Sequence, residues 1–251
     1  MSGILHLGPH TLGRFPLVVG VATRLETLDA PPARQAIACD VLEIRLDLMG
    51  QEAERWLREQ SDAPRRMPPI LLTLRSVREG GRFDGSDSER IARYTALLPF
   101  VAAVDVELES PAFAEVCAAA HAMRRCVIGS FHDFSETPPD ARLRALLDHG
   151  RRAGADIVKI ATWTGNEKEI ARLAALLGSH GTKSPLALMG MGPFGPDSRL
   201  RLAAAGSVLV YGFLDEPNAP GQPSGVALVR NLSDAMPAYR AARAALGTDG
   251  G

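Results

Sequence analysis

The sequence predicts a single (β/α)8 TIM barrel with a short N-terminal hairpin, and two regularities carry this prediction. Short runs of β-branched and other apolar residues recur roughly every 20 to 35 residues. Each run is followed by a segment rich in Ala, Leu and Arg with helical periodicity. Alternating strands and helices indicate a parallel sheet, and eight such units in 251 residues indicate closure into a barrel. Because no linker or shift in composition divides the chain, we expect one domain over residues 1–251.

Eight runs are expected to be strands because they are short, apolar and bounded by turn-forming residues. In chain order they are Leu17–Ala22, Val41–Asp47, Ile70–Arg75, Ala103–Leu108, Cys126–Phe131, Asp156–Ala161, Leu186–Met189 and Val208–Tyr211. The segments between and after them are expected to be helices because their apolar residues recur three and four positions apart. These are Ala33–Cys39, Glu52–Gln60, Ser88–Leu98, Ala112–Met123, Asp140–Gly150, Glu167–Leu177, Asp197–Ala205 and a last helix near Val226–Leu246.

Before the first strand, residues 4–8 and 12–14 have the pattern of a small hairpin, which we expect to close the amino-terminal end of the barrel. An open, doubly wound sheet is the alternative fold. It is weakened because Gly20-Val21-Ala22-Thr23 lacks the glycine spacing of a dinucleotide-binding fingerprint.

Charge and hydropathy exclude several classes of function. The formal net charge is -1, the pI is about 6.6 and the arginines are scattered, so we expect no nucleic-acid partner. No apolar run approaches the length of a membrane span and the first residues do not resemble a signal peptide, so we expect no membrane partner and a cytoplasmic location. Cys39, Cys117 and Cys126 are expected to be buried thiols. No His/Cys cluster has ligand spacing, so we expect no metal and no cofactor.

Lys159 is the most unusual residue of the chain, because it lies inside the apolar run Asp156-Ile157-Val158-Lys159-Ile160-Ala161. Only three of the 28 Lys+Arg residues are lysines, so surface charge is supplied almost entirely by arginine. A desolvated lysine can lose its proton and attack a carbonyl carbon, whereas a guanidinium stays protonated. Lys159 is therefore a candidate Schiff-base lysine. The alternative is a lysine that extends from the end of a strand to water.

Other ionisable residues stand at the carboxyl ends of successive expected strands, where barrel enzymes carry their active sites. Glu43, Arg45 and Asp47 alternate with apolar residues, which places them on one face of a strand, inside the barrel. Later strands contribute Arg75, Glu79, His132, Lys159 and Arg199 at the same end. A purely structural network of ion pairs is the alternative, and for Asp47 the sequence leaves both interpretations open.

If this set converges, it supports metal-free imine chemistry. Nearby arginines and desolvation disfavour the ammonium form of Lys159, so the amine can attack a ketone or aldehyde. The imine acidifies the adjacent C–H, and the His132 imidazole can take that proton and pass it to a leaving hydroxyl. Arg75 and Arg199 offer planar forks to a carboxylate or to hydroxyls. Dehydration and aldol cleavage both remain open, and activity is expected to fall at acid pH as these groups protonate.

Six motifs of the chain, taken in order, resemble those of the type I 3-dehydroquinate dehydratases. They are Glu43-Ile44-Arg45-Leu46-Asp47, Thr73-Leu74-Arg75-Ser76 with Glu79-Gly80-Gly81, Ser130-Phe131-His132-Asp133-Phe134, Asp156-Ile157-Val158-Lys159-Ile160, Met189-Gly190-Met191-Gly192 with Gly195 and Ser198-Arg199, and Ala219-Pro220-Gly221-Gln222. The resemblance implies a (β/α)8 barrel, a homodimer, and conversion of 3-dehydroquinate to 3-dehydroshikimate, the third step of the shikimate pathway in aromatic amino acid biosynthesis.

The resemblance also implies a role for each site residue. Lys159 would form the imine, His132 would transfer the proton, and Glu79 would orient the histidine. The remaining residues would contact the substrate. Glu43, Arg45 and Arg75 would bind its hydroxyls, Arg199 its carboxylate, and Met189 and Met191 its ring. Tyr211 would also line the binding site, and Asn218 and Gln222 would approach the substrate from a closing loop.

Four positions depart from the family pattern. Ile44 replaces a usual aromatic, but the alternation of the strand points it away from the site. Tyr211 stands where phenylalanine is common and adds a hydroxyl that needs a partner if it is buried. Asn218 stands where the family has serine, and Trp163 places a large ring near the mouth of the barrel.

Two other classes of function remain as alternatives. A barrel aldolase or transaldolase would use the same imine but act on phosphorylated sugars, for which phosphate-binding glycines after the last two strands are expected. A relative that binds a small ligand without turnover would depend on Lys159 only for affinity.

Overall fold

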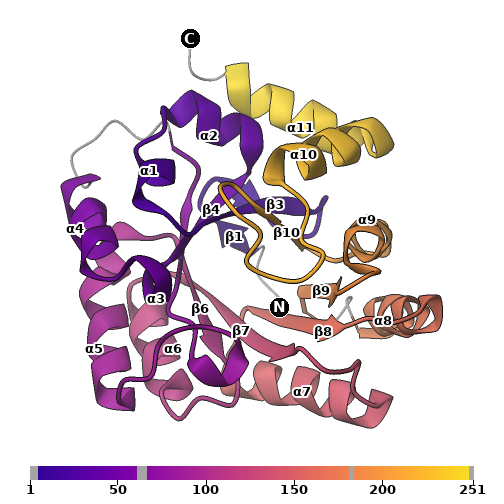
Figure 1. The fold of residues 1–251 in the computed structure, drawn as a ribbon, viewed down its shortest axis with the longest axis horizontal. Coiled ribbons are helices and arrows are strands. Elements are labelled where there is room, and N and C mark those ends of the chain that lie inside the picture. Colours follow the sequence, from indigo (N-terminus) through magenta and orange to yellow (C-terminus); the bar gives the residue numbers. More distant parts are fainter. Residues whose placement is uncertain (1–4, 61–66, 181–183, 249–251) are drawn as a thin grey trace.

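The computed structural model describes residues 5–60, 67–180 and 184–248, and these form a nearly closed barrel of eight parallel strands. The strands follow the order β10-β3-β4-β5-β6-β7-β8-β9. They are β3 (Leu17–Ala22), β4 (Val41–Arg45), β5 (Ile70–Thr73), β6 (Ala103–Glu107), β7 (Cys126–Asp133), β8 (Ile157–Trp163), β9 (Leu186–Met191) and β10 (Leu209–Phe213). Helices surround the strands (Figure 1). The predicted TIM barrel is confirmed.

The helices that follow the strands agree with the predicted ones to within about one turn. They are α2 (Pro32–Ala38), α4 (Gln51–Glu59), α5 (Asp87–Leu97), α6 (Phe113–Ala122), α7 (Asp140–Ala153), α8 (Glu167–His180) and α9 (Gly195–Ala204). Shorter elements lie in the loops: α1 (Leu25–Leu28), α3 (Leu46–Met49) and the 3₁₀ turns η2 (Val77–Glu79) and η3 (Leu98–Phe100).

The last predicted helix, near Val226–Leu246, is wrong as a single element. The structure has two helices there, α10 (Gly225–Ala235) and α11 (Pro237–Thr248). Proline disfavours helical backbone in the preceding residue, and Met236 is extended with φ −128° and ψ 94°. The bend lets α11 pack against the barrel, where Tyr239 is fully buried and donates a hydrogen bond to Asp40 Oδ2 at 2.8 Å.

The second predicted strand, Val41–Asp47, was too long. Strand β4 ends at Arg45, and residues from Leu46 form the short helix α3. Asp47 therefore does not continue the strand's inward face. Its carboxylate instead accepts both Nε and Nη2 of Arg45, at 2.9 and 2.8 Å.

Alternate residues of each strand face the barrel interior and the helices. Leu71 and Ile128 belong to the interior cluster, whereas Ile44 and Val104 pack in the layer between the strands and the outer helices. The expectation that Ile44 points away from the interior is confirmed. Inward positions near the carboxyl ends of β4 to β8 are mainly polar, whereas Met189, Met191 and Tyr211 of β9 and β10 continue the apolar interior up to that end.

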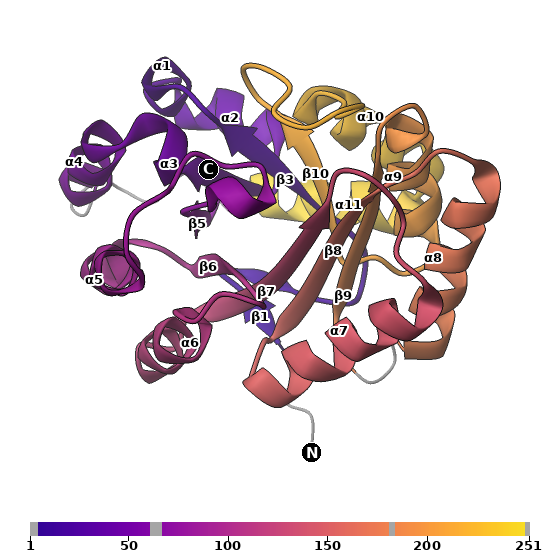
Figure 2. The ribbon, with the colours of Figure 1, turned by 60° about the horizontal axis from the view of Figure 1, so that its bottom comes forward.

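The N-terminal hairpin closes the amino-terminal end of the barrel. Its strands are β1 (His6–Leu7) and β2 (His10–Thr11), paired antiparallel. Leu7 and Leu12 are buried in the same cluster as the interior residues of the strands. Figure 2 shows β1 beneath the barrel. The predicted hairpin is confirmed, except that Ile4 lies outside the described residues.

Strands β9 and β10 meet at the one incomplete seam of the described sheet. Near the bottom of the barrel, the Val208 amide donates to the Leu186 carbonyl at 2.8 Å. The buried Ser207 hydroxyl accepts from the Leu188 amide at 3.0 Å. Hydrogen bonds from the Ser207 side chain and from the backbone just before β10 thus replace the regular backbone hydrogen bonds of a β-sheet between these two strands and keep the barrel closed.

Candidate active site

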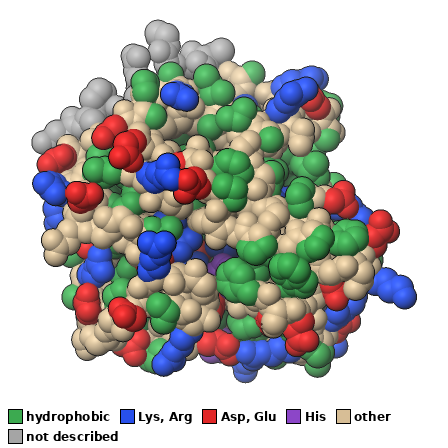
Figure 3. Space-filling view, viewed as in Figure 1, with side chains coloured by type: hydrophobic (Ala, Val, Ile, Leu, Met, Phe, Trp, Pro, Cys, Tyr) green, Lys and Arg blue, Asp and Glu red, His purple; other side chains and the backbone are tan. Residues whose placement is uncertain are grey.

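A pocket of about 540 Å³, counting the part open to solvent, lies at the carboxyl ends of the barrel strands. Figure 3 shows this face hollowed near its centre, with basic and histidine side chains in the depth. The twelve predicted site residues all line the pocket: Glu43, Arg45, Arg75, Glu79, His132, Lys159, Met189, Met191, Arg199, Tyr211, Asn218 and Gln222. Six more residues line it that were given no role from the sequence: Val21, Thr73, Gly80, Phe134, Ala161 and Ala219.

Lys159 projects inward from β8 and is 4% exposed. Its Nζ donates to Asp105 Oδ2 at 2.8 Å and lies 4.1 Å from the centre of the Tyr211 ring. A carboxylate and an aromatic face both stabilise a cation, either the ammonium or an iminium formed from it. Lys159 therefore does not extend to water, as the alternative interpretation required.

Asp105 is the functional residue that sequence reasoning missed, although it lies in a strand end where charges were expected. Its carboxylate also accepts from Arg75 Nη2 at 2.7 Å and from the Ser130 hydroxyl at 2.6 Å. Burial opposes ionisation, but Arg75 and Lys159 outweigh it and hold the pKa of Asp105 well below its usual range. A buried carboxylate that stays ionised thus lies beside Lys159, behind the residues that line the pocket.

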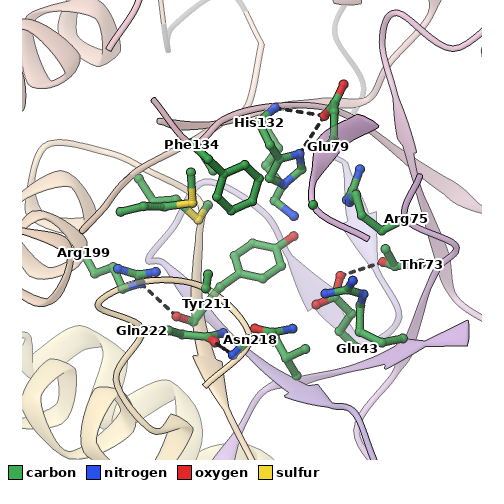
Figure 4. A pocket seen from close by; sticks show the side chains of 18 residues that line it. Glu43, Thr73, Arg75, Glu79, His132, Phe134, Arg199, Tyr211, Asn218 and Gln222 are labelled. Carbon is green, nitrogen blue, oxygen red and sulfur yellow. Dashed lines mark hydrogen bonds and ion pairs between the residues drawn. The ribbon is translucent and has the colours of Figure 1, made fainter. Parts of the chain in front are cut away.

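His132 and Glu79 form a second pair at the end of β7, the strand next to β8 (Figure 4). Glu79 Oε2 lies 2.8 Å from His132 Nδ1 and accepts the His132 backbone amide at 2.9 Å. Burial, then the charges of Arg75 and Lys159, lower the pKa of His132 well below its ordinary value. A neutral ring that donates from Nδ1 has its lone pair on Nε2, which makes Nε2 a general base.

Local backbone geometry explains how Glu79 reaches the histidine. Glu79 ends the turn η2, which Ser76 caps by accepting the Arg78 amide. Gly80 follows with φ +79°, a conformation that favours glycine, and a Cβ there would lie 2.5 Å from the Phe134 ring. The Glu79-Gly80-Gly81 motif therefore positions a carboxylate in a tight turn against the pocket wall. Burial raises the pKa of Glu79 to about 7.

The wall formed by β4 and β5 presents polar groups that are each held by a neighbour. Glu43 Oε1 accepts the Thr73 hydroxyl at 2.6 Å. Arg45 is fixed by Asp47, whose carboxylate also accepts the Arg75 backbone amide at 3.2 Å. Asp47 does not line the pocket, so the structure favours the structural interpretation of this residue.

Arg199 is a buried guanidinium, 2% exposed, with no carboxylate partner among the described residues. Its Nε donates to the Tyr211 carbonyl at 3.0 Å, and Nη1 donates to the Gly190 carbonyl at 3.0 Å. These bonds join β9 to β10 near the top of the barrel. Burial lowers the pKa of Arg199 to about 10. A buried cation without a counter-ion marks a binding place for an anion.

Asn218 and Gln222 lie on the loop between β10 and α10, which covers the pocket. The backbone amide of Asn218 donates to Gln222 Oε1 at 2.9 Å, and the Gly192 backbone amide donates to the Pro220 carbonyl at 2.9 Å. Asp215 anchors the start of this loop by accepting the Thr23 amide and hydroxyl at 2.8 and 2.7 Å.

Trp163 was expected near the mouth of the barrel, but it does not line the pocket. Gly192 has φ +78°, and a Cβ at that position would lie 2.9 Å from atoms of the Trp163 ring. The indole therefore packs against the loop after β9. It supports this loop and is not placed to contact a substrate.

The described parts of the chain contain neither a metal-binding cluster nor a helix that could span a membrane. Within residues 5–60, 67–180 and 184–248, no group of three or more His, Cys, Asp or Glu side chains could hold a metal ion. In the same ranges, no helix has both the length and the hydropathy needed to cross a membrane. Cys39, Cys117 and Cys126 are buried free thiols, as predicted.

The family model of the type I 3-dehydroquinases matches residues 17–235. The chain belongs to this family. The 3-dehydroquinate dehydratase of Methanocella arvoryzae is 33% identical over 192 residues, covering 76% of this chain and 85% of that protein. The catabolic 3-dehydroquinate dehydratase of Acinetobacter baylyi is 32% identical over 216 residues, covering 79% of this chain and 76% of that protein.

The fold of this type I 3-dehydroquinase is similar to those of solved family members. The type I 3-dehydroquinate dehydratase of Clostridium difficile, solved with covalently modified comenic acid, has a TM-score of 0.79 and 27% identity. The comparison covers 92% of this chain and 97% of that one. The resemblance inferred from the six motifs and the predicted enzyme family are confirmed.

Proposed function

We propose that this protein dehydrates 3-dehydroquinate to 3-dehydroshikimate, the third step of the shikimate pathway, through a Schiff base on Lys159. The observation that carries the proposal is the arrangement of three groups around one pocket. They are a buried lysine beside a carboxylate, an imidazole held by a second carboxylate, and a buried arginine without a counter-ion. These supply a nucleophile, a base and an anion site for a keto acid.

The charges of the pocket residues indicate which part of the substrate each residue binds. The substrate carboxylate lies at Arg199, with Asn218 and Gln222 closing over it from the loop. The hydroxyls of the substrate face Glu43, Arg45 and Arg75, whose remaining donors and acceptors point to the pocket. Met189 and Met191 contact the ring as apolar neighbours.

Imine formation begins at Lys159. Its Nζ loses a proton and attacks the ketone carbon, and the ketone oxygen leaves as water to give an iminium ion. Asp105 lies beside the new cation, and the Tyr211 ring presents its face to it. Both interactions stabilise the iminium within the buried pocket.

Elimination then needs one proton carrier. His132 Nε2 takes a proton from the carbon next to the iminium carbon, which gives an enamine and an imidazolium. The imidazolium returns this proton to the departing hydroxyl as the C–O bond breaks. Water hydrolyses the conjugated iminium and releases the product with a free Lys159. The net change is the loss of one water molecule.

The relatives support this chemistry. The Methanocella arvoryzae and Acinetobacter baylyi relatives are named as 3-dehydroquinate dehydratases. The Clostridium difficile structure was solved with covalently modified comenic acid, a carboxylic acid. The proposed roles of Lys159 as a nucleophile and of Arg199 as an anion site agree with covalent chemistry on a carboxylic acid.

The proposal is tested by following the conjugated enone of the product, which absorbs in the ultraviolet whereas the substrate does not. We expect the purified protein to convert 3-dehydroquinate and to ignore phosphorylated sugars. Cleavage of a phosphorylated sugar without conversion of 3-dehydroquinate would favour the aldolase alternative instead. Binding of 3-dehydroquinate without turnover would favour the ligand-binding alternative.

Family resemblance supports further features of the proposal. We propose a single catalytic domain over residues 1–251, a homodimer, and action in the cytoplasm on a small molecule without a cofactor, metal or nucleic acid. Sedimentation velocity tests the assembly, and a mass close to 26.8 kDa would contradict the dimer.

A further inference from the structure

The Tyr211 hydroxyl is a buried polar group with no hydrogen-bond partner in the described structure. Tyr211 is 4% exposed on β10, and its side chain lines the pocket. Among buried side-chain atoms of the described residues, only Gln35 Oε1 and Arg90 Nε share this condition, and neither residue lines this pocket. Burying a hydroxyl without a partner costs free energy, so proteins rarely retain one without a function.

The position of the ring limits what the hydroxyl can contact. Lys159 Nζ lies 4.1 Å from the ring centre, so a carbon bonded to Nζ sits close to this ring. In Figure 4 the hydroxyl points toward the wall of Glu43 and Arg75, whereas Arg199 lies on the other side. The group is thus aimed at the part of the pocket assigned to substrate hydroxyls, away from the anion site.

The hydroxyl acts as a donor at neutral pH. Burial, with the carboxylates of Asp105 and Glu43, raises the pKa of Tyr211 well above its ordinary value. Glu43 uses Oε1 to accept the Thr73 hydroxyl, which leaves Oε2 as an acceptor. A substrate hydroxyl both donates and accepts, so Glu43 and Tyr211 together can satisfy one such group.

We propose that Tyr211 donates a hydrogen bond to the substrate hydroxyl on the carbon adjacent to the ketone, and so selects substrates that carry it. This inference rests on the proposed function, because Lys159 and Arg199 set the orientation of the ring. With the ketone carbon at Nζ and the carboxylate at Arg199, the vicinal hydroxyls face Glu43. The hydroxyl next to the ketone is the one nearest to the Tyr211 ring. An analogue without it leaves the tyrosine unpaired in the complex, which is a strong basis for discrimination.

The test compares Tyr211→Phe with the unmodified protein on two substrates, 3-dehydroquinate and its analogue lacking the hydroxyl beside the ketone. We expect kcat/KM of Tyr211→Phe for 3-dehydroquinate to fall about tenfold. We expect both proteins to process the analogue equally well. An equal loss on both substrates, or no loss on 3-dehydroquinate, would overturn the inference and leave the proposed function standing. An unmodified protein that converts neither substrate would overturn both.

Thermal stability provides a matched control for this substitution. Because Tyr211 has no hydrogen bond to lose, Tyr211→Phe should keep or raise the melting temperature of the free protein. Tyr94 is also buried, but its hydroxyl accepts the Leu74 amide at 2.9 Å and donates to the Asp105 carbonyl at 2.6 Å. Tyr94→Phe should therefore lower the melting temperature. A lower melting temperature for Tyr211→Phe as well would mean that its hydroxyl has a structural partner in the free protein, against the inference.

Discussion

The contact between His132 Nδ1 and Glu79 Oε2 fixes which ring nitrogen is free for proton transfer. A carboxylate at 2.8 Å holds the hydrogen on Nδ1 and leaves the lone pair of Nε2 facing the pocket. When Nε2 accepts a proton from the substrate, the same carboxylate stabilises the imidazolium. We therefore expect Glu79 to act as a positioning residue whose charge controls how well His132 works as a base.

The raised pKa of Glu79 gives this residue a pH signature. Burial raises the pKa to about 7, so below this pH the carboxylate gains a proton and no longer stabilises the imidazolium. We expect kcat/KM to fall below about pH 7, and to fall further only at the lower pH at which His132 itself is protonated. In Glu79→Gln, the rate should drop by roughly 10- to 100-fold and the decline near pH 7 should disappear.

A pH profile of kcat/KM for both proteins measures this. Glu115→Gln, on the exposed face of α6, is the matched control and should keep the profile of the unmodified enzyme. If Glu79→Gln retained the decline near pH 7, another group would be responsible for it.

Individual site residues differ in how far the sequence could predict them. Lys159 stands out because lysine is rare in this chain and its run is apolar, and His132 because it follows a strand directly. The position of Asp105 beside Lys159 could not be read in this way. The two residues are 54 positions apart, and their contact depends on the register of three strands and on side-chain directions. The lack of a hydrogen-bond partner for the Tyr211 hydroxyl likewise cannot be predicted from the sequence, because it depends on the positions of all neighbouring side chains.

Among the elements, the existence of each strand was predicted accurately, whereas the residues at which strands end were predicted less well. Inward and outward residues alternate as period-two geometry requires, which is why the apolar runs gave the barrel. The chain leaves β4 earlier than its alternating pattern suggests, because Asp47 turns back to bind Arg45 and the amides of Arg75 and Arg82. Such tertiary bonds cannot be recognised from neighbouring residues in the sequence. The break between α10 and α11 could have been recognised, because the residue before Pro237 avoids helical backbone.

The loop between β10 and α10 is tied down by Asp215, and this predicts a role in substrate binding. Asp215 also accepts the Arg24 amide at 3.1 Å and the Thr27 hydroxyl at 2.9 Å, so it joins the loop to the segment after β3. In Asp215→Ala we expect a looser loop around Asn218 and Gln222 and a rise in KM of roughly 3- to 10-fold, with a smaller change in kcat. Steady-state kinetics and hydrogen exchange of the loop measure both effects.

Glu216→Ala is the matched control, because Glu216 pairs with Arg24 at the exposed surface and should contribute little. Burial disfavours ionised Asp215, but the bonds from Thr23, Glu216 and Thr27 outweigh it and lower its pKa. The anchor should therefore persist at neutral pH and weaken only as the pH falls below the ordinary carboxyl range near ~4. A KM of Asp215→Ala equal to that of Glu216→Ala would contradict the anchoring role.

At the scale of the whole molecule, we expect barrel closure and substrate binding to depend on the same residue, Arg199. Ser207 joins β9 to β10 near the bottom, and Arg199 joins them near the top through carbonyls of both strands. The guanidinium thus completes the barrel while remaining available to an anion from the pocket. The sequence predicted eight strands and their closure into a barrel, but not this seam, because hydrogen bonding around a closed sheet depends on the tilt and stagger of all strands together.

The central claim is that Lys159 forms an imine with 3-dehydroquinate. The most direct measurement is the mass of the intact protein and of its peptides after incubation with 3-dehydroquinate and borohydride, which reduces an imine to a stable amine. We predict one adduct, confined to the peptide that contains Lys159. It should be absent in Lys159→Met and retained in Lys168→Met, a matched change at an exposed lysine of α8. An adduct on another lysine, or a folded protein that converts the substrate yet is never trapped, would contradict the account.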